Sequence, residues 1–400
     1  MESTTCVQQL AVPASAPPPD PTSLYIALST VRDRRKRRGR RYPLALGLTL
    51  LVLGKLAGET TMTGIAHWAR LRTGWLAAVF RLPRPQVPCA NTYTLVCANV
   101  DLAELNAVVG RCFQPAARAT PPPTVAPARG SHHLAVDGKT LRGTRCGGAT
   151  PHAALHQLGL YDITHQVMLA QRPVASHDHE IPGAADLLTG RDLRGCVVTA
   201  DALHTQRAFC AQVVRQGGDY LLLVKGNQAQ LRQDIAFLFA DPWPPYLERP
   251  STTTVDKGHG RLEVRRRHAS AELNALAGEQ WVGLQHVFQV EREVLRQGKL
   301  SQEVVGGITS LPRGVTPPRR LLAISRAHWQ LENGRPWRRD VTLGEDACRV
   351  RTGQAPHVLA ALNNVVLTLM DHLEVRNVPA QMRTFCAQPS AALRLLLGGS

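Results

Sequence analysis

The sequence lacks an apolar run long enough to cross a membrane. Its most apolar stretch, from Pro43 to Gly54, ends at Lys55, whereas a membrane-spanning helix needs about 20 apolar residues. The N-terminus carries the proline-rich string AVPASAPPPDP where a secretory signal would have a charged and then apolar leader. These absences predict a cytoplasmic protein with no membrane partner.

The cysteines show neither a disulfide framework nor a zinc-binding pattern. There are nine, an odd number, and no two of them form a C-x-x-C pair. Exported disulfide proteins use even sets of cysteines, and zinc sites use closely spaced pairs. Scattered cysteines such as Cys97, Cys196 and Cys348 therefore indicate reduced thiols in a protein core.

Acidic residues are scarce relative to basic ones. The chain has 30 Asp and Glu against 47 Lys and Arg, a formal net charge of +17. Such a surplus implies a polyanionic partner, for which nucleic acid is the first candidate and an acidic membrane surface the alternative. The block from Arg32 to Arg41 holds eight basic residues against Asp33. A solvated charge patch is the plainer interpretation, but so dense a block favours DNA phosphates. The candidate contacts are Arg34, Arg35, Lys36, Arg37 and Arg38.

The chain divides into five parts by composition. Four hundred residues with 44% hydrophobic content suit two or three domains. We expect a disordered basic arm over 1–41, a helical domain over 42–116, a proline-rich linker over 117–130, an α/β domain over 131–375 and a C-terminal tail over 376–400. In the α/β domain, apolar runs predict strands at 134–136, 155–161, 167–173, 196–200 and 220–224, with a helix over 202–216 between the last two. A β-rich insertion is expected at about 241–320, followed by a helix from Pro318.

Three acidic residues stand where a metal-dependent site would place them. Asp137 lies in LAVDGKTLRG, Asp201 in GCVVTADALHTQ and Glu332 in SRAHWQLENGRPW. Asp201 follows a buried apolar run, and the ends of such strands form the sheet edge that carries chemistry in α/β folds. Converging carboxylates bind Mg²⁺, and two ions about 4 Å apart can hold the attacking and leaving oxygens of a phosphodiester. The three motifs together favour phosphoryl transfer.

Each motif alone also fits a simpler role. Asp137 followed by Gly138 is a common turn dipeptide. Asp201 could cap the helix that follows it, and Glu332 could be an ordinary helix-surface carboxylate. The pair Glu345 and Asp346 is an alternative source of the third acid, although adjacent acids usually form a solvated surface pair. The cluster from His177 to Glu180 fits a polar turn better than a metal site.

Seven strings follow one another along the chain. They are DGKTLRG, GCVVTADALHTQ, GGDYLLLVKGNQ, HGRLEVRR, GITSLP, HWQLEN and EDACRVRTGQAP. In this order they resemble bacterial insertion-sequence transposases of the DDE type, in the branch that includes the H-repeat-associated proteins. The likeness runs from about residue 40 to about residue 370, nearly the whole chain.

The resemblance implies an α/β fold with a ribonuclease-H-like catalytic core and a β-rich insertion, preceded by a helical DNA-binding domain. It implies Mg²⁺-dependent cleavage and strand transfer at the terminal inverted repeats of an insertion sequence, with two Mg²⁺ ions that Mn²⁺ can replace. The implied partners are double-stranded DNA, as element ends and target, and a second copy of the chain in a synaptic complex at the bacterial nucleoid.

Position by position, Asp137, Asp201 and Glu332 match the family's catalytic and metal-binding acids. Further residues match positions that face DNA or the edge of the site. These are Lys139, Arg142, Lys225, Asn227, Arg261, His328 and Trp329.

The string after Glu332 departs from the family pattern at Gly334 and Pro336. Glycine and proline inside a helix cost about 1 and about 3 kcal/mol, so the catalytic helix is expected to stop just beyond its acid. That expectation keeps open an alternative function, a catalytically decayed transposase that acts only as a DNA-binding protein or repressor. A metal-dependent nuclease unconnected with transposition is a further alternative, since it would share the core but would not need the helical domain.

Overall fold

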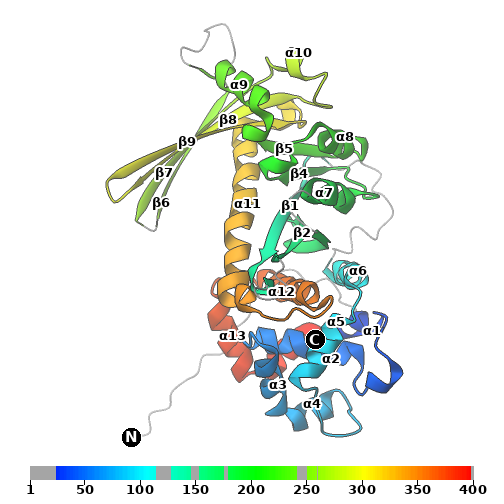
Figure 1. The fold of residues 1–400 in the computed structure, drawn as a ribbon. Helices are drawn as coiled ribbons and strands as arrows, with labels where there is room; N and C mark the ends of the chain where they lie inside the picture. The colour runs from blue at the N-terminus through cyan, green and yellow to red at the C-terminus, as the bar shows by residue number, and fades with distance from the viewer. Residues whose placement is uncertain are drawn as a thin grey trace, which may run out of the picture.

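The computed structural model describes residues 24–113, 128–145, 153–174, 179–240, 250–258 and 260–397. The chain starts with a helical region (Figure 1). Its helices are α1 (Leu24–Ser29), α2 (Leu44–Leu56), α3 (Met62–Arg70), α4 (Thr73–Val79), α5 (Ala90–Ala98) and α6 (Leu102–Phe113). Every residue of α2 is buried, because α1, α3 and α5 pack around it. The most apolar stretch of the sequence is thus the centre of this region. Within the described ranges no helix is long and apolar enough to cross a membrane.

The C-terminal helices complete this helical region. They are α12 (Ala355–His372), α13 (Val378–Ala387) and α14 (Pro389–Leu397). All three pack against α2, and α14 also packs against α1. The expected C-terminal tail is therefore helical as far as Leu397, because its apolar side chains cover α2.

The expected disordered arm is wrong for residues 24–41. Leu24 and Leu28 of α1 are buried. The basic block that follows is folded around Asp33, whose carboxylate accepts hydrogen bonds from the Arg35 side chain at 2.8 and 3.0 Å. An internal acid and a buried helix face thus order a segment that its charge alone would leave extended.

The core is one nine-stranded sheet. Its strands are β1 (His132–Leu141), β2 (Leu155–Asp162), β3 (Val167–Val174), β4 (Cys196–Ala200), β5 (Asp219–Val224), β6 (Ser251–Gly258), β7 (Arg261–Ser270), β8 (His286–Arg296) and β9 (Lys299–Thr309). Their order is β3-β2-β1-β4-β5-β9-β8-β7-β6. β1 to β3 form an antiparallel meander, and β4 and β5 run parallel to β1. This topology confirms the predicted ribonuclease-H-like fold, and the insertion extends the same sheet from β5 through β9.

Helices cover both faces of the sheet. α7 (Glu180–Leu188) and α8 (Arg207–Arg215) lie on one face, and α11 (Pro318–Trp337) crosses the other (Figure 1). The short helix α9 (Ala229–Leu238) precedes the insertion, and α10 (Asn274–Ala277) lies within it, between β7 and β8. Side chains alternate along a strand, so Val198 of β4 joins the core under α7 and α8 while Val197 joins the core under α11. The odd-numbered residues of β1 and β4 therefore face α11.

α11 does not stop at its glycine and proline. It runs through Gly334 and Pro336 to Trp337 and continues as a π-helical turn, η8 (Arg338–Thr342). Burial of Arg335 explains this result: its guanidinium bonds Asp371 at 3.0 Å and lies 4.1 Å over the Tyr161 ring. Tertiary contacts of this kind outweigh weak local helix propensity. The expected truncation of the catalytic helix is wrong.

Candidate active site

Asp137 and Asp201 occupy equivalent positions on neighbouring parallel strands. The pairing of β1 with β4 ends at Val136 and Ala200. Asp137 and Asp201 are the residues that directly follow this last pair. Asp137 lies within β1, which continues to Leu141 by pairing with β2, so the turn interpretation of Asp137 and Gly138 is wrong. The alternation of side chains assigns both aspartates to the face that α11 covers.

Asp201 is both a cap and an accessible carboxylate. Its backbone is extended, and its Oδ1 accepts a hydrogen bond from the Leu203 backbone N–H at 3.1 Å. Its side chain is 50% exposed, and His204 Nε2 lies 3.7 Å from Oδ1. Burial lowers the pKa of His204, which favours the neutral ring. A carboxylate offers about four lone-pair directions, so one capping bond leaves capacity for a metal ion.

Asn227 holds the loop beside Asp201. It follows β5, and its Nδ2 donates to the Ala202 carbonyl at 2.6 Å. This contact fixes the backbone immediately after the aspartate. We predicted a contact with DNA or the edge of the site for Asn227; its side chain is exposed apart from this bond.

Glu332 lies in α11, one helical turn after His328. The side chains of Glu332 and Asn333 are outside the described part of the structure. The position of the turn before Glu332 is well defined, because His328 Nδ1 lies 3.0 Å from Thr199 Oγ1 of β4. His328 is 3% exposed, so it does not present the DNA contact that we expected of it; it packs α11 onto the sheet.

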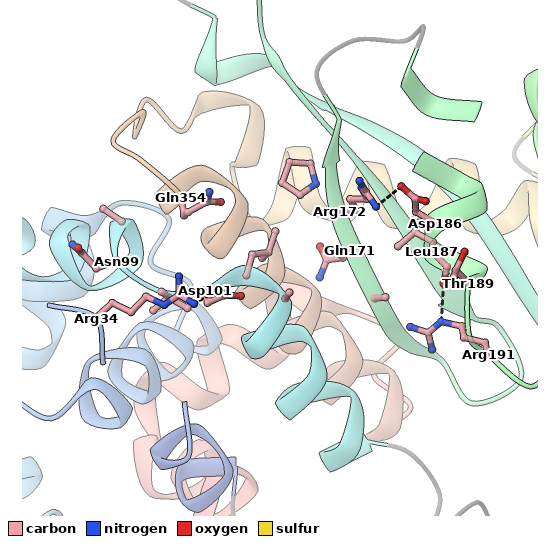
Figure 2. Close-up of a pocket in the computed structure, with 16 residues that line it drawn as sticks. Arg34, Asn99, Asp101, Gln171, Arg172, Asp186, Leu187, Thr189, Arg191 and Gln354 are labelled. Carbon is pink, nitrogen blue, oxygen red and sulfur yellow. Dashed lines mark hydrogen bonds and ion pairs between the residues drawn. The ribbon is translucent and has the colours of Figure 1, made fainter. Parts of the chain in front are cut away.

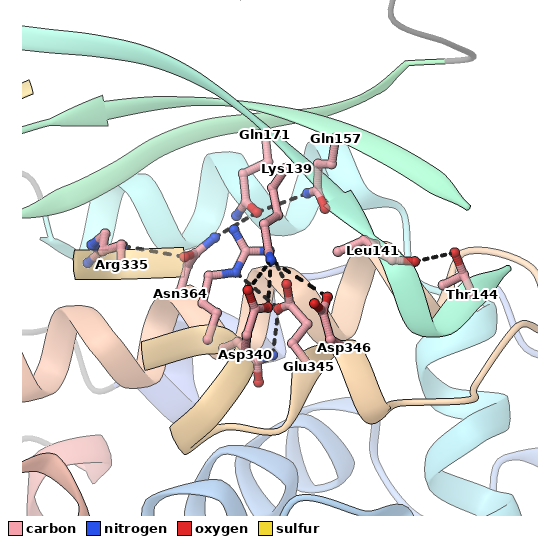
Figure 3. Close-up of polar contacts among 12 residues, drawn as sticks. Lys139, Leu141, Thr144, Gln157, Gln171, Arg335, Asp340, Glu345, Asp346 and Asn364 are labelled. Atoms are coloured by element: carbon pink, nitrogen blue, oxygen red, sulfur yellow. Dashed lines mark hydrogen bonds and ion pairs between the residues drawn. The ribbon is translucent and has the colours of Figure 1, made fainter. Parts of the chain in front are cut away.

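Lys139 is paired with acids and is largely buried. Its Nζ lies 2.5 Å from Asp340 Oδ1 and 3.7 Å from Asp346 (Figure 3). Its side chain is 12% exposed, because β1 runs against the turn that follows α11. Asp340 is also partly buried, and this burial raises the pKa of its carboxyl despite Lys139. The predicted phosphate contact of Lys139 is therefore replaced by an internal ion pair, whereas the Arg142 side chain is 80% exposed.

The alternative third acids are engaged elsewhere. Glu345 is buried and lies 2.7 Å from Arg339, and Asn363 donates to it at 2.7 Å. Burial opposes ionisation of Glu345, but the Arg339 guanidinium, the Asn363 hydrogen bond and Lys139 together outweigh it and lower the pKa of this carboxyl. Asp346 belongs to the Lys139 cluster. Glu345 and Asp346 are therefore both bound to basic side chains of the fold, which disfavours either of them as the third metal ligand.

A basic groove opens beside the carboxyl end of β5. It has a volume of about 870 Å³ and lies between α11 and the antiparallel strands β6 to β9. Its basic lining residues are Lys225, Lys257, Arg261, Arg265, Arg292 and Arg326. Buried Glu263 holds two of them, Arg265 at 2.6 Å and Arg292. Trp329 is half-buried on the α11 wall. Lys225, Arg261 and Trp329, predicted separately from the sequence, thus share one groove.

Comparison with known proteins identifies the family. The family model "Transposase DDE domain" matches residues 128–369, and the model "DDE_Tnp_1-associated" matches residues 25–112. The chain belongs to the DDE transposase family. An uncharacterized protein from the dhlA 3′ region of Xanthobacter autotrophicus is 31% identical over 278 residues, 69% of this chain and 90% of that protein. The H repeat-associated putative transposase YhhI of Escherichia coli K12 is 28% identical over 247 residues, 60% of this chain and 65% of that protein.

A solved structure shows a more distant likeness. The cryo-EM structure of the piggyBac transposase synaptic complex with hairpin DNA aligns with a TM-score of 0.41 at 10% identity, over 92% of this chain and 80% of that chain.

In this transposase the basic block of residues 32–41 has two kinds of side chain. Arg34 pairs with Asp101 at 2.6 Å, and Arg35 is 6% exposed and bound to Asp33. Lys36, Arg37 and Arg38 are exposed. The predicted DNA contact is thus not available to the Arg35 guanidinium in this fold, since it holds the segment together. Arg34 lies on the rim of a second hollow, of about 810 Å³, between the start of α6 and β3 with α7 (Figure 2).

The donor chemistry of the two described acids fits a hard divalent cation. Asp137 and Asp201 supply carboxylate oxygens, the ligands that Mg²⁺ prefers. Among described side chains, no three of the His, Cys, Asp and Glu residues form a metal-binding group; the Glu332 side chain is not among them. The neighbouring His156 is 3.0 Å from Glu180, a buried pair. His177 and Asp178 of the polar cluster are outside the described residues.

Several residues near the site were not found from the sequence. Thr199 sits in an apolar run and gives no local signal of a role. Arg335, Asn364 and Gln171 form a buried chain of hydrogen bonds, of 3.3 and 2.9 Å, that joins α11 to α12 and β3 (Figure 3). These residues are far apart in the sequence, and hydrophobic periodicity detects only relations between neighbouring residues.

Proposed function

We propose that this chain is an active DDE transposase that cleaves and joins DNA at the terminal inverted repeats of an insertion sequence. The observation that carries the proposal is the position of the acids. Asp137 and Asp201 directly follow Val136 and Ala200, the last residues that pair between the parallel strands β1 and β4. Glu332 is one helical turn beyond the contact of α11 with β4. Three carboxylates from these three elements would bind two Mg²⁺ ions, which Mn²⁺ can replace.

The metal ions, when bound, supply activation of the attacking oxygen and stabilisation of the leaving oxygen. The chain's own residues hold the geometry. Asn227 and the capping bond of Asp201 fix the loop at the end of β4. Asp340 holds the Lys139 ammonium at 2.5 Å, so this cation is balanced and does not compensate the charge of Asp137.

The DNA partner is assigned to the cationic surfaces of the chain. Lys225, Arg261 and Trp329 of the basic groove lie on the flank of the acids, where a strand entering the site would pass. Arg142 adds an exposed cation beyond β1. Lys36, Arg37 and Arg38 contribute sequence-independent phosphate contacts. Since two element ends must be brought together, we propose a homodimer on DNA, acting at the nucleoid.

The test is cleavage of the element's own ends. Purified protein is incubated with a plasmid that carries the DNA flanking this reading frame, with and without Mg²⁺. The wild type is expected to cut at the ends, and Asp137→Ala, Asp201→Ala and Glu332→Ala are expected to bind the DNA without cutting it. The matched control is Asp346→Ala, an acid close to the site but held by Lys139. If Glu332→Ala cuts normally while Glu345→Ala does not, the third acid is misassigned; if no variant differs from a wild type that binds but never cuts, the chain is a DNA-binding protein only.

A further inference from the structure

A buried threonine joins the three elements that carry the acids. Thr199 Oγ1 of β4 lies 2.8 Å from His133 Nε2 of β1 and 3.0 Å from His328 Nδ1 of α11. The three residues are 1%, 8% and 3% exposed. The three side chains therefore contact one another directly in the protein interior.

The sequence separations between the cluster and the acids place each acid on the same face of its strand or helix as the cluster residue before it. Asp137 follows His133 by four residues and Asp201 follows Thr199 by two, and even offsets on a strand keep side chains on one side. Glu332 follows His328 by four residues, which on a helix also keeps the face. The cluster and the two aspartates therefore lie on the face of the sheet that α11 covers, and Glu332 belongs to the next turn of this helix after His328.

One arrangement of protons satisfies every contact of the cluster. The Thr199 hydroxyl has one proton, and it donates to the Leu134 carbonyl at 3.3 Å. A hydroxyl also accepts two hydrogen bonds, so both histidine rings can donate to it. In this arrangement His133 carries its proton on Nε2 and His328 carries its proton on Nδ1. Burial, with the neighbouring His328, lowers the pKa of His133 to about 3, so its ring stays neutral at physiological pH.

We infer that His133, Thr199 and His328 are positioning residues that set the distance of Glu332 from the two aspartates and thereby the metal affinity of the site. This inference rests on the proposed function. Metal ligands must be held within about 0.5 Å of their productive geometry. α11 crosses the sheet with weak local propensity at its end, and the cluster holds it on β4 four residues before Glu332.

The test measures metal binding without DNA. Free Mn²⁺ is titrated against the protein and followed by its EPR signal, and thermal unfolding is recorded for every variant. Thr199→Val, which removes the hydroxyl and keeps the shape, is expected to weaken Mn²⁺ binding by about tenfold, in the range found for groups that orient metal ligands. Thr199→Ser is expected to bind within about twofold of wild type. The matched control is Thr309→Val, since Thr309 is equally buried and donates to the Tyr220 carbonyl at 2.7 Å; it should lower stability but leave Mn²⁺ affinity unchanged.

Amide substitutions give a second and sharper criterion. An asparagine nitrogen can take the place of histidine Nδ1, and a glutamine nitrogen that of Nε2. His328→Asn and His133→Gln are therefore expected to keep Mn²⁺ affinity, whereas His328→Gln and His133→Asn are expected to lose it at similar stability.

Three results would overturn the inference. If Thr199→Val binds Mn²⁺ like the wild type while Asp137→Ala does not, the cluster has no positioning role and the proposed function stands. If the four amide variants lose affinity only in proportion to their loss of stability, the cluster is merely structural. A wild type that binds no Mn²⁺ at all would overturn the cluster and the proposed metal site together.

Discussion

At the scale of single residues, the charges and rings around the acids are mostly engaged with one another. Lys139 is held by Asp340, and Arg335 by Asp371. His133 is buried without a carboxylate partner, and its environment penalises the charged ring. Because burial lowers the pKa of His133, the stability of the fold depends on pH through this ring.

The pH dependence of His133 can be predicted in sign. Its pKa falls from 6.5 to about 3 on folding, so below pH 6.5 the unfolded chain takes up a proton that the folded chain does not. Its contribution to stability is therefore complete above 6.5 and is lost as the pH falls toward 3, with a slope of at most about 1.4 kcal/mol per pH unit. Urea unfolding of His133→Gln between pH 7 and pH 4 should show a shallower loss than the wild type.

The control for this prediction is His67→Gln, because His67 is exposed. Its pH profile should match that of the wild type. Equal slopes for wild type and His133→Gln would mean that the His133 ring is protonated in the folded protein, contrary to its burial.

At the scale of elements, α11 links the insertion, the sheet and the helical region. It starts beside the insertion, crosses β5, β4 and β1, and ends against α12 (Figure 1). The anchor at its end is Arg335, which bonds Asp371 and Asn364 of α12. Gly334, in contrast, has an exposed position where an added Cβ meets nothing within 4 Å.

Two neighbouring substitutions in α11 should therefore have opposite effects. Gly334→Ala is expected to stabilise the protein by about 1 kcal/mol, the cost of glycine in a helix. Arg335→Met is expected to destabilise it by about 2 kcal/mol, because it removes the buried guanidinium that bonds Asp371 and Asn364, while Arg338 still pairs with Asp371. Denaturant midpoints measure both effects. Cleavage by Gly334→Ala should equal that of the wild type; a gain in cleavage would show that the helix end is frayed, as the sequence alone suggested.

The sequence correctly predicted the strands and helices that their own residues determine. Cys196–Ala200 is a strand as expected, because five buried residues in a row need no distant information. The position of Asp201 at the end of this strand followed from the same run. The extension of β1 beyond Asp137 was missed because β2, and not the β1 sequence, determines it. The length of α11 was missed because the partner of Arg335 lies 36 residues away.

The same distinction applies to the candidate site. Acidic residues in three strings were visible, and their family pattern implied the metal. The partner of Lys139 was not visible, since Asp340 is 201 residues away. The buried role of His328 also depends on a distant partner, Thr199. Local patterns can therefore identify charged candidates, but only the fold separates those that face solvent from those that face each other.

At the scale of the whole molecule, only part of the net charge of +17 is available to a DNA partner. Many arginines pair with acids inside the fold, among them Arg35, Arg265 and Arg335. The exposed cations of the basic block that form no ion pair with any described residue are Arg32, Lys36, Arg37, Arg38 and Arg41. The expected DNA affinity therefore depends on these five cations, among which Lys36, Arg37 and Arg38 form an uninterrupted run.

Replacing Lys36, Arg37 and Arg38 together by Ala should weaken binding to specific and random duplexes alike. The salt dependence should flatten by about 3 in the slope of log K against log salt, roughly 0.9 for each phosphate contact. Fluorescence anisotropy at several salt concentrations measures this slope. The charge-matched control replaces Arg376, Arg383 and Arg394, exposed residues after α12 and on α13 and α14, and should change it little. Loss of end preference with unchanged random-DNA affinity would show instead that the three residues recognise sequence.

The most direct test of the central claim, that Asp137, Asp201 and Glu332 bind the same metal ions, is rescue by a softer cation. A thiolate is a poor ligand for Mg²⁺, which requires hard oxygen, and a better one for Mn²⁺. Asp137→Cys, Asp201→Cys and Glu332→Cys are each expected to abolish cleavage of the element ends in Mg²⁺ and to recover a measurable part of it in Mn²⁺, while Asp346→Cys cleaves equally in both. Absence of rescue at all three acids, or rescue at Glu345→Cys in place of Glu332→Cys, would contradict the assignment.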